Sequence, residues 1–196
     1  MTLDSEYAAS RIALADADAT EALAQALART APASAVAPVV VFLHGDLGAG
    51  KSTLARAWLR ALGVQGAIRS PTYTLVERYL LTTPELLPHD AQSEGAQSEG
   101  AQLPPREAVH LDLYRIGSGS ELEFLGLDDI PAALWLVEWP ERGQGGLLMA
   151  DLHIRLALPE AEVDGRVCRL NAGTAAGQAW LERLATEYGL PLLPEA

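Results

Sequence analysis

GDLGAGKST, residues 45–53, is the most informative segment of this chain for predicting its fold. It fits the pattern G-x-x-x-x-G-K-[ST] through Gly45, Gly50, Lys51 and Ser52. This pattern describes a loop whose backbone N–H groups surround phosphate oxygens. Lys51 is the one lysine among the 14 basic residues of the chain. Because a lysine carries a compact charge and an arginine a planar fork, this choice also favours a phosphate-binding loop, or P-loop.

The residues on either side of the loop predict the strand and the helix that a P-loop joins. PVVVFLHG (38–45) is a β-branched run that predicts a buried strand, and KSTLARAWLRAL (51–62) predicts a helix. The positive N-terminal end of that helix would face the same anion. The alternative is a glycine-rich turn that fits the pattern by chance. The residues that we expect to contact a nucleotide are Asp46, Leu47, Gly48, Ala49, Gly50, Lys51, Ser52 and Thr53.

Length and charge limit the classes of protein to which the chain can belong. With 196 residues, of which 49% are hydrophobic, we expect a single domain over residues 1–196. A formal charge of −12 argues against a broad electrostatic grip on nucleic acid, so contact with RNA is expected to be indirect. Neither a signal peptide nor a long apolar run is present, which favours a cytoplasmic protein without a membrane span. Cys168 is the only cysteine, which excludes a disulfide within the chain.

The rest of the chain alternates between helical and strand-like patterns. The first predicted helix has Asp18 and Glu21 as a capping box. Residues 81–106 contain the repeat AQSEGAQSEGAQ and predict a flexible, low-complexity insertion at a hairpin tip. Short helical turns are expected over 118–130. The predicted helices are 18–30, 51–62 and 174–189, and the predicted strands are 38–45, 75–80, 107–116, 133–140, 151–158 and 166–170.

Two carboxylates follow predicted buried strands. Asp112 comes after AVHL and Glu138 after ALWLV. Ligands of open α/β sheets bind outside the carboxyl ends of the strands, so we expect both acids near the nucleotide. With the Ser52 hydroxyl they are the predicted ligands of Mg²⁺, and Glu138 is the predicted group that orients or deprotonates the attacking water. The alternative for each is an acid solvated at the end of its strand.

Three further groups of residues have less specific patterns. SPTYT (70–74) carries hydroxyl groups, among them Thr72, which could close on the terminal phosphate; the alternative is a turn into the next strand. His44, His89, His110 and His153 share no metal-ligand spacing, and we interpret them as core or solvated histidines. Trp139 is interpreted as a packing residue, or as one that lies against a nucleotide or a partner.

In order, GDLGAGKST, RSPTYTLVE, HLDLYR, ELEFLGLDD and VEWPERGQG resemble successive motifs of the TsaE (YjeE) family of small bacterial ATPases. The motifs cover about residues 44–146, and the preceding TEALAQALA is also similar. The resemblance implies a three-layer P-loop NTPase fold of the α/β class, with a mixed sheet and an antiparallel C-terminal extension. It implies ATP or ADP and Mg²⁺ as ligands. The implied functional positions are Lys51, Ser52, Thr72, Asp112 and Glu138.

The resemblance also implies a biological role. The ATPase works with the TsaB and TsaD proteins, which attach threonylcarbamoyl to the adenosine beside the anticodon in tRNAs that read ANN codons. It supports turnover of that transferase and does not itself transfer the carbamoyl group. This chain departs from the family in Ser52, where threonine is more common, and in the long segment around AQSEG.

Two other functions remain open from the residues alone. A P-loop kinase for a small molecule would share the fold, since fold alone does not give function. Such kinases usually carry an arginine-rich lid, whereas residues 81–106 contain only Arg106. The second alternative is a nucleotide-dependent scaffold without useful hydrolysis. A GTPase is disfavoured because its N-K-x-D motif needs a second lysine.

Overall fold

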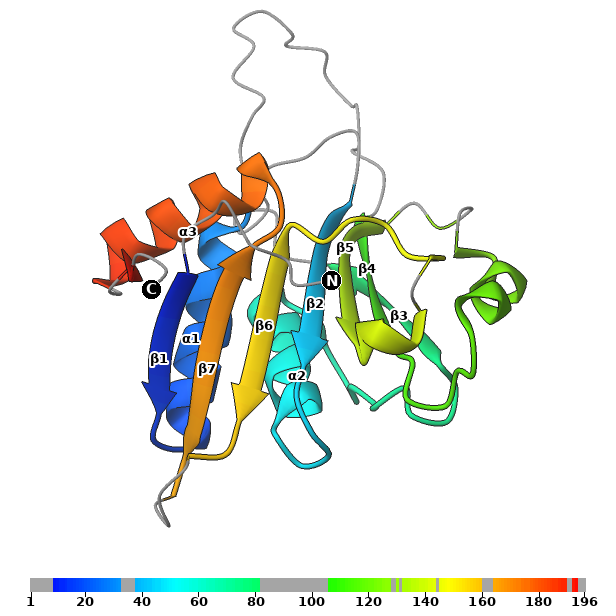
Figure 1. Ribbon diagram of the computed structural model, residues 1–196, viewed down its shortest axis with the longest axis horizontal. Coiled ribbons are helices and arrows are strands. Elements are labelled where there is room, and N and C mark those ends of the chain that lie inside the picture. Colours follow the sequence, from blue (N-terminus) through cyan, green and yellow to red (C-terminus); the bar gives the residue numbers. More distant parts are fainter. Residues whose placement is uncertain are drawn as a thin grey trace, which may run out of the picture.

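The computed structural model describes residues 9–32, 38–81, 106–127, 130, 132–143, 145–159, 164–189 and 192–193 (Figure 1). The helices are α1 (Ala17–Thr30), α2 (Lys51–Ala61) and α3 (Ala175–Tyr188), with 3₁₀ segments η2 (Gly119–Leu125) and η4 (Pro140–Gly143). The strands are β1 (Ala9–Leu14), β2 (Val39–His44), β3 (Val76–Leu81), β4 (Arg106–Asp112), β5 (Ala132–Glu138), β6 (Leu152–Ala157), β7 (Arg166–Ala172) and β8 (Leu192–Leu193).

All of these strands belong to one sheet, in the order β3-β4-β5-β2-β6-β7-β1-β8. The four central strands, β4, β5, β2 and β6, run parallel to one another. Strand β3 is antiparallel to β4, and β7 is antiparallel to both β6 and β1. The prediction of an α/β fold with a mixed sheet is therefore confirmed. The antiparallel extension begins only at β7, and it includes the N-terminal strand β1 as well as C-terminal strands.

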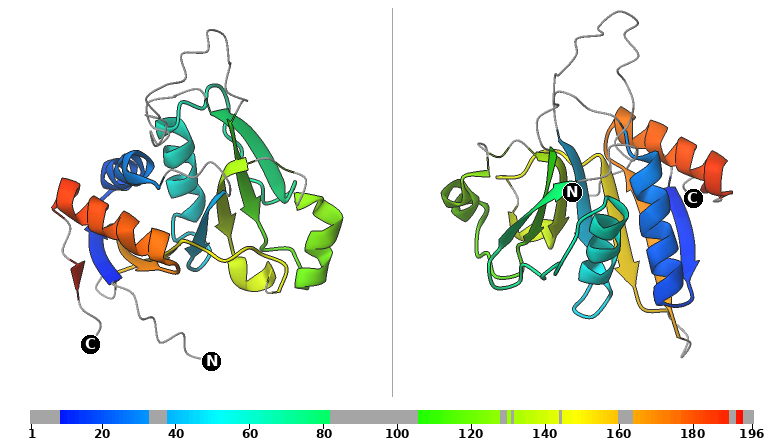
Figure 2. Two further views of the ribbon diagram at one scale, coloured as in Figure 1. Left: turned by 90° about the horizontal axis from the view of Figure 1, so that it is seen from above. Right: turned by 180° about the vertical axis from the view of Figure 1, so that it is seen from behind.

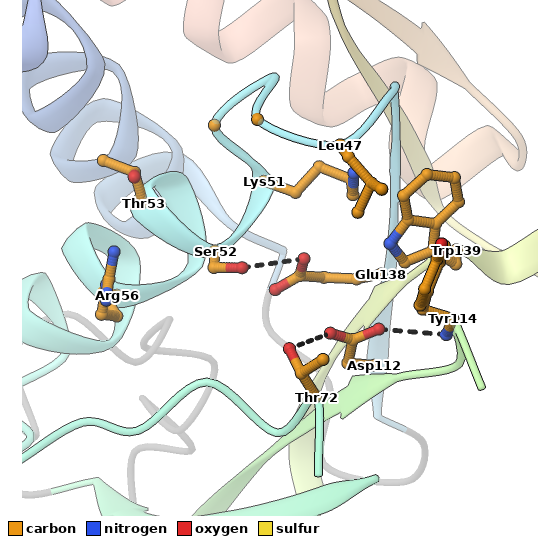
Figure 3. A pocket seen from close by; sticks show the side chains of 12 residues that line it. Leu47, Lys51, Ser52, Thr53, Arg56, Thr72, Asp112, Tyr114, Glu138 and Trp139 are labelled. Atoms are coloured by element: carbon orange, nitrogen blue, oxygen red, sulfur yellow. Dashed lines mark hydrogen bonds between the residues drawn. The ribbon is translucent and has the colours of Figure 1, made fainter.

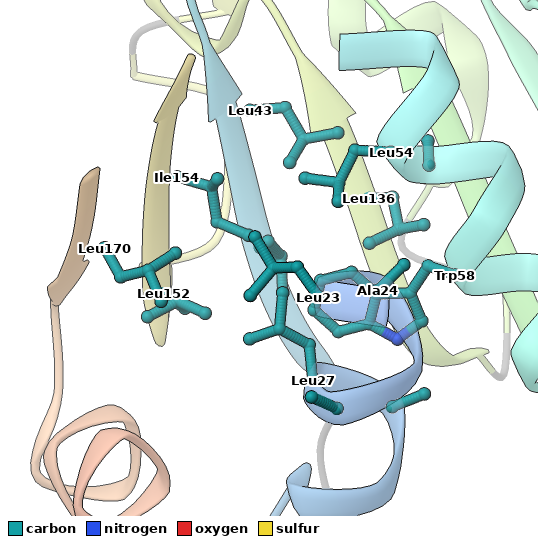
Figure 4. Close-up of a cluster of buried hydrophobic side chains, with 14 of the residues drawn as sticks. Leu23, Ala24, Leu27, Leu43, Leu54, Trp58, Leu136, Leu152, Ile154 and Leu170 are labelled. Carbon is teal, nitrogen blue, oxygen red and sulfur yellow. The ribbon is translucent and has the colours of Figure 1, made fainter. Parts of the chain in front are cut away.

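Two helices cover one face of the sheet (Figure 2). Leu23 and Leu27 of α1 and Leu54 and Trp58 of α2 are buried against inward side chains of the strands, such as Ile154 (Figure 4). This spacing is that of an amphipathic helix, whose apolar stripe faces the core.

The N-terminus of α1 differs from the prediction, and α3 also packs on this face of the sheet. The predicted capping box at Asp18 is wrong: α1 begins earlier, and Asp16 is its N-cap because its carboxylate accepts the N–H of Ala19. α3 packs into the same cluster, since the rings of Trp180 and Trp58 are 5.7 Å apart and Trp180 Nε1 donates to Thr30 Oγ1 at 3.1 Å.

The opposite face is covered over only part of its width. Val109, Trp135 and Val137, with neighbouring apolar residues, form a second cluster beneath η2 and η4. A third layer of helices was expected and is not found among the described residues, where this face carries the two short 3₁₀ segments. Over β6, β7 and β1 the outward side chains include Arg11 and Arg169, which are exposed. Such polar positions gain nothing from a covering helix, so that half of the sheet remains uncovered by described helices.

The predicted insertion falls between two paired strands. Leu81, the last residue of β3, lies opposite Arg106, the first residue of β4. Residues 82–105 lie outside the described ranges, so the prediction for this insertion stays a prediction, as does the single domain. Within the described ranges, no helix has the length and apolar character needed to cross a membrane.

Candidate functional site

The P-loop connects the C-terminal end of β2 directly to the first turn of α2. Gly50 is the N-cap of α2 with a φ of 106°, in the left-handed region, and no side chain caps the helix. The first turn of α2 also contains no acidic residue. In contrast, Asp16 caps α1 and Thr174 caps α3 through side-chain hydrogen bonds. The N–H groups at the start of α2 are thus left without side-chain partners, which suits an anionic ligand.

Gly45 is the tightest position of the loop. Its φ is 135°, and an added Cβ would lie 2.2 Å from the carbonyl oxygen of Leu156 on β6. We expect Gly45→Ala to lower the free energy of unfolding by about 3 kcal/mol or more, through strain and overlap. In the control, Gly48→Ala, φ is 78° but the Cβ would meet no atom within 4 Å, so about 1–2 kcal/mol is expected. Urea denaturation measures both, and equal losses would contradict the packing argument.

A cleft of about 310 Å³ opens in front of the loop (Figure 3). Most of the residues predicted to contact a nucleotide line it. Asp46 and Ala49 do not: Asp46 is exposed, and Ala49 is buried with its carbonyl accepting from Arg166. The cleft is lined by Leu47, Gly48, Gly50, Lys51, Ser52, Thr53, Arg56, Thr72, Asp112, Tyr114, Glu138 and Trp139.

Lys51 is held inside the loop by the loop's own backbone. Its Nζ donates to the carbonyl oxygens of Gly45 at 2.6 Å and Asp46 at 2.9 Å. The same ammonium lies 3.9 Å from the centre of the Trp139 ring. Burial lowers the pKa of Lys51 from its ordinary value, while the carboxylates of Glu138 and Asp112 oppose this shift. The charge of Lys51 therefore sits at the floor of the cleft, where a phosphate would meet it.

Glu138, at the end of β5, is held by two hydrogen bonds. Ser52 Oγ donates to Glu138 Oε2 at 3.0 Å, and His110 Nε2 lies 2.8 Å from Glu138 Oε1. His110 is 0% exposed and Glu138 is 2% exposed. The carboxylate is thus fixed beside the hydroxyl that starts α2, with His110 behind it.

Asp112, at the end of β4, connects the cleft to the SPTYT segment. Thr72 Oγ1 donates to Asp112 Oδ2 at 2.7 Å, and the Tyr114 N–H donates to Asp112 Oδ1 at 3.0 Å (Figure 3). Thr72 Oγ1 is also 3.0 Å from Ser70 Oγ. Asp112 and Glu138 are paired in register on adjacent parallel strands. The structure therefore brings together the four residues predicted as catalytic, namely Lys51, Thr72, Asp112 and Glu138.

The predicted Mg²⁺ ligands supply the kind of oxygen atoms that this ion binds. Ser52, Asp112 and Glu138 all line the cleft, and two of them carry a negative charge. The described residues contain no group of three or more His, Cys, Asp or Glu side chains suited to a metal ion. The hydroxyl of Ser52 and the carboxylates of Asp112 and Glu138 fit Mg²⁺, which usually binds through one or two carboxylates, waters and substrate phosphates.

The sequence alone gave no role at the site to His110 or Arg166, and it left Trp139 as either a packing residue or one that lies against a nucleotide or a partner. His110 was interpreted as a core or solvated histidine; it is buried, and it also contacts Glu138. The signal lay in its position two residues before Asp112, which places both on one side of a strand. Trp139 has a φ of 57°, rare for a bulky residue, and its ring lies against Lys51. Arg166, on β7, donates to the carbonyl oxygens of Gly48 and Ala49 on the outer side of the loop.

His44, the residue before the loop, gives stability a dependence on pH. Its ring stacks on that of His153 at 5.3 Å, and burial with the nearby His153 and Arg155 lowers its pKa to about 4. In the unfolded chain the pKa is about 6.5, so protons bind the unfolded state first as the pH falls. His44 therefore leaves the free energy of unfolding unchanged above pH 6.5, and it lowers this free energy as the pH falls from 6.5 toward 4.

We expect this loss to be on the order of 2–3 kcal/mol in the free energy of unfolding. Denaturation of wild type and of His44→Asn at pH 7 and pH 4.5 measures it. The wild type should lose more stability than the variant between these two pH values. Equal losses in both proteins would contradict the assignment to His44.

The sequence model described as "Threonylcarbamoyl adenosine biosynthesis protein TsaE" matches residues 14–167. The chain belongs to the TsaE family. The match includes the P-loop and every residue that lines the cleft. This TsaE-family chain therefore has a role in the biosynthesis of tRNA threonylcarbamoyladenosine.

Individual relatives agree with the family match. The chain is similar to the tRNA threonylcarbamoyladenosine biosynthesis protein TsaE of Haemophilus influenzae, with 37% identity over 142 residues, covering 71% of this chain and 74% of the relative. The protein of the same name from Streptomyces coelicolor is 32% identical over 143 residues, covering 72% and 82%. The crystal structure of YdiB from Bacillus subtilis has a TM-score of 0.65 at 22% identity, covering 93% of this chain and 99% of that one. The structural similarity supports the fold.

Proposed function

We propose that this TsaE-family chain is a Mg²⁺-dependent ATPase. The observation that carries the proposal is one cleft in which the uncapped N-terminus of α2 meets the ends of β4 and β5. That arrangement places an ammonium, a hydroxyl and two carboxylates around one space, which is what phosphoryl transfer to water requires. Unlike a kinase for a small molecule, an enzyme that transfers the phosphoryl group to water needs neither an arginine-rich lid nor a pocket for a second substrate.

Each residue has a part in the proposed reaction. The loop amides and Lys51 would hold the phosphates, and Ser52 and Asp112 would hold the ion. Mg²⁺, when bound, would neutralise charge on the phosphate oxygens. Glu138 orients the attacking water and accepts its proton, and Thr72 connects the SPTYT segment to Asp112. The products would be ADP and inorganic phosphate.

The proposed ATPase acts in the cytoplasm as an accessory to a transferase made of TsaB and TsaD proteins. Hydrolysis would weaken its docking on the transferase and so allow repeated cycles of tRNA modification. Contact with tRNA is indirect in this proposal, because a chain of net charge −12 does not attract a polyanion over a wide surface.

Co-purification with TsaB and TsaD, followed by an ATPase assay, tests this proposal. The isolated chain should hydrolyse ATP slowly, and the mixture should hydrolyse it faster in a Mg²⁺-dependent manner. Complete absence of hydrolysis in both, despite bound ATP, would indicate instead a nucleotide-dependent scaffold.

His110 is a positioning residue in this proposal, since it touches Glu138 and not the cleft. His110→Phe keeps an aromatic ring but removes the donor to Glu138. We expect kcat to fall by about 10-fold or more, with the Kd for ATP nearly unchanged, because a misplaced base affects the chemical step. His110→Gln, whose amide can still donate, should recover part of kcat. If both variants lose only stability and keep kcat, the positioning role is wrong.

A further inference from the structure

Three arginines form one row across the uncovered half of the sheet. Arg11 of β1 lies in register with Arg169 of β7, and Arg169 lies in register with Arg155 of β6. Their neighbours along each strand, such as Ile154 and Leu170, are buried beneath the helices. Because successive side chains of a strand point to opposite faces, the three arginines point to the uncovered face. All three are exposed. We call Arg11, Arg155 and Arg169 the arginine row.

The arginine row is unpaired within the structure. None of its three side chains makes a hydrogen bond or an ion pair in the described part of the chain. Like charges placed opposite one another on adjacent strands destabilise a sheet. The chain has 26 acidic residues, but none occupies a position of the row, where its carboxylate would relieve the repulsion. Because of this mutual repulsion, a row of three arginines is unfavourable for folding alone, which points to an anionic partner.

The residues beside the row indicate which kind of anion. Ala13, Val167 and Ala157 lie in register along one side of the row and form a flat strip of small apolar side chains. Among the outward positions of β1, β6 and β7 that the structure describes, none is Phe, Tyr or Trp, and the ring of His153 is already engaged, stacked on His44 and edge-on to Phe42. Single-stranded RNA usually stacks its bases on aromatic side chains, and three charges are few for a phosphate backbone. Arginine, in contrast, is enriched at protein–protein interfaces.

We propose that the arginine row is a docking surface for a protein surface with clustered carboxylates, on the TsaB–TsaD complex. The inference rests on the proposed function for the identity of this partner. Guanidinium groups bind carboxylates through two parallel hydrogen bonds, which gives both charge and geometric complementarity. The strand spacing of about 4.8 Å sets the separation of the carboxylates that would fit.

The row lies next to the nucleotide loop. Arg155 is in register with His44 of β2, and His44 precedes Gly45. The next residue on β6, Leu156, places its carbonyl against Gly45. A partner seated on the row therefore borders the strand that carries the P-loop, so docking and nucleotide binding can influence each other.

Binding of purified TsaB–TsaD complex to the full chain, measured by biolayer interferometry at several salt concentrations, tests the inference. The test variant is Arg11→Glu with Arg169→Glu. The control is Arg29→Glu with Arg69→Glu, which makes the same change in net charge at exposed positions on α1 and in the segment before β3. We expect the test variant to bind on the order of 100-fold more weakly, and the control less than about 5-fold. The wild-type affinity should fall with salt more steeply than that of the test variant. The ATPase rate of each isolated chain should equal that of wild type.

Each other outcome overturns the inference. Equal loss in the test and control variants would show an effect of net charge and no docking at the row. If the test variant binds as tightly as the wild-type chain, the proposed function stands and only docking at the arginine row is refuted. No binding of wild-type chain to TsaB–TsaD would refute the partner in the proposed function as well. If the wild-type chain binds a tRNA transcript tightly and the test variant does not, the row binds RNA. If light scattering shows self-association that the test variant loses, the row binds a second copy of the chain.

Discussion

Lys51→Ala should abolish productive nucleotide binding. The substitution removes the only lysine of the chain and the one cation whose Nζ lies within the P-loop, on the carbonyl oxygens of Gly45 and Asp46. The phosphates would then meet loop amides and two carboxylates, Asp112 and Glu138, without the charge that balances them. We expect ATP hydrolysis to fall on the order of 10³-fold or more, as for a lost charged clamp on a transferring phosphoryl group. Calorimetric titration with Mg²⁺ and ATP measures the binding, and a phosphate-release assay measures the rate.

The control for this prediction is Lys51→Arg. Its guanidinium keeps the charge but needs more room and a forked partner, so we expect only partial recovery of binding. The thermal stability of both variants should be compared with that of wild type, because Lys51 is buried. Near-normal hydrolysis in Lys51→Ala would refute the assignment of residues 45–53 as a phosphate-binding loop.

Glu138→Gln and Asp112→Asn should have different effects. Glu138 lies beside Ser52 with His110 behind it, so Glu138→Gln removes the proposed base while it keeps the shape of the side chain. We expect ATP to stay bound and hydrolysis to slow by about 10²-fold or more. Asp112 holds Thr72 and Tyr114 and is the proposed ligand of the ion. Asp112→Asn should therefore weaken binding of ATP in the presence of Mg²⁺ more than it slows the bound complex.

Two assays separate these effects. Equilibrium binding of ATP, with Mg²⁺ and with EDTA, reports the ion, and single-turnover hydrolysis at saturating ATP reports the chemical step. Thr72→Val serves as the matched control for Asp112, because it removes the hydroxyl donor and leaves the carboxylate. If Glu138→Gln and Asp112→Asn give the same pattern in both assays, the division of roles is wrong.

Local patterns predicted the centre of the sheet well. The strand expected over 38–45 is β2, Val39–His44, and the helix expected over 51–62 is α2, Lys51–Ala61. These elements are specified by a β-branched run, a glycine-rich loop and an amphipathic stripe, all of which act over short distances. The positions of Asp112 and Glu138 followed from the rule for strand ends, and the structure places both in the cleft.

Features that depend on distant parts of the chain were not predictable in this way. β1, ASRIAL, was missed because alanines are weak strand formers, and its pairing with β7 joins Ala9 to Asn171. The contact of His110 with Glu138 depends on the neighbouring strand β5. The arginine row depends on the register of three strands, and no single segment reveals it.

The most direct test of the proposed function is the yield of modified tRNA per transferase. TsaB and TsaD would be incubated with excess tRNA, the threonylcarbamoyl donor and ATP, with and without this chain, and threonylcarbamoyladenosine would be quantified by mass spectrometry. We predict many modified tRNAs per transferase with the wild-type chain, and about one or fewer without it or with Lys51→Ala or Glu138→Gln. Equal multiple-turnover yields with and without the wild-type chain would contradict the proposed role.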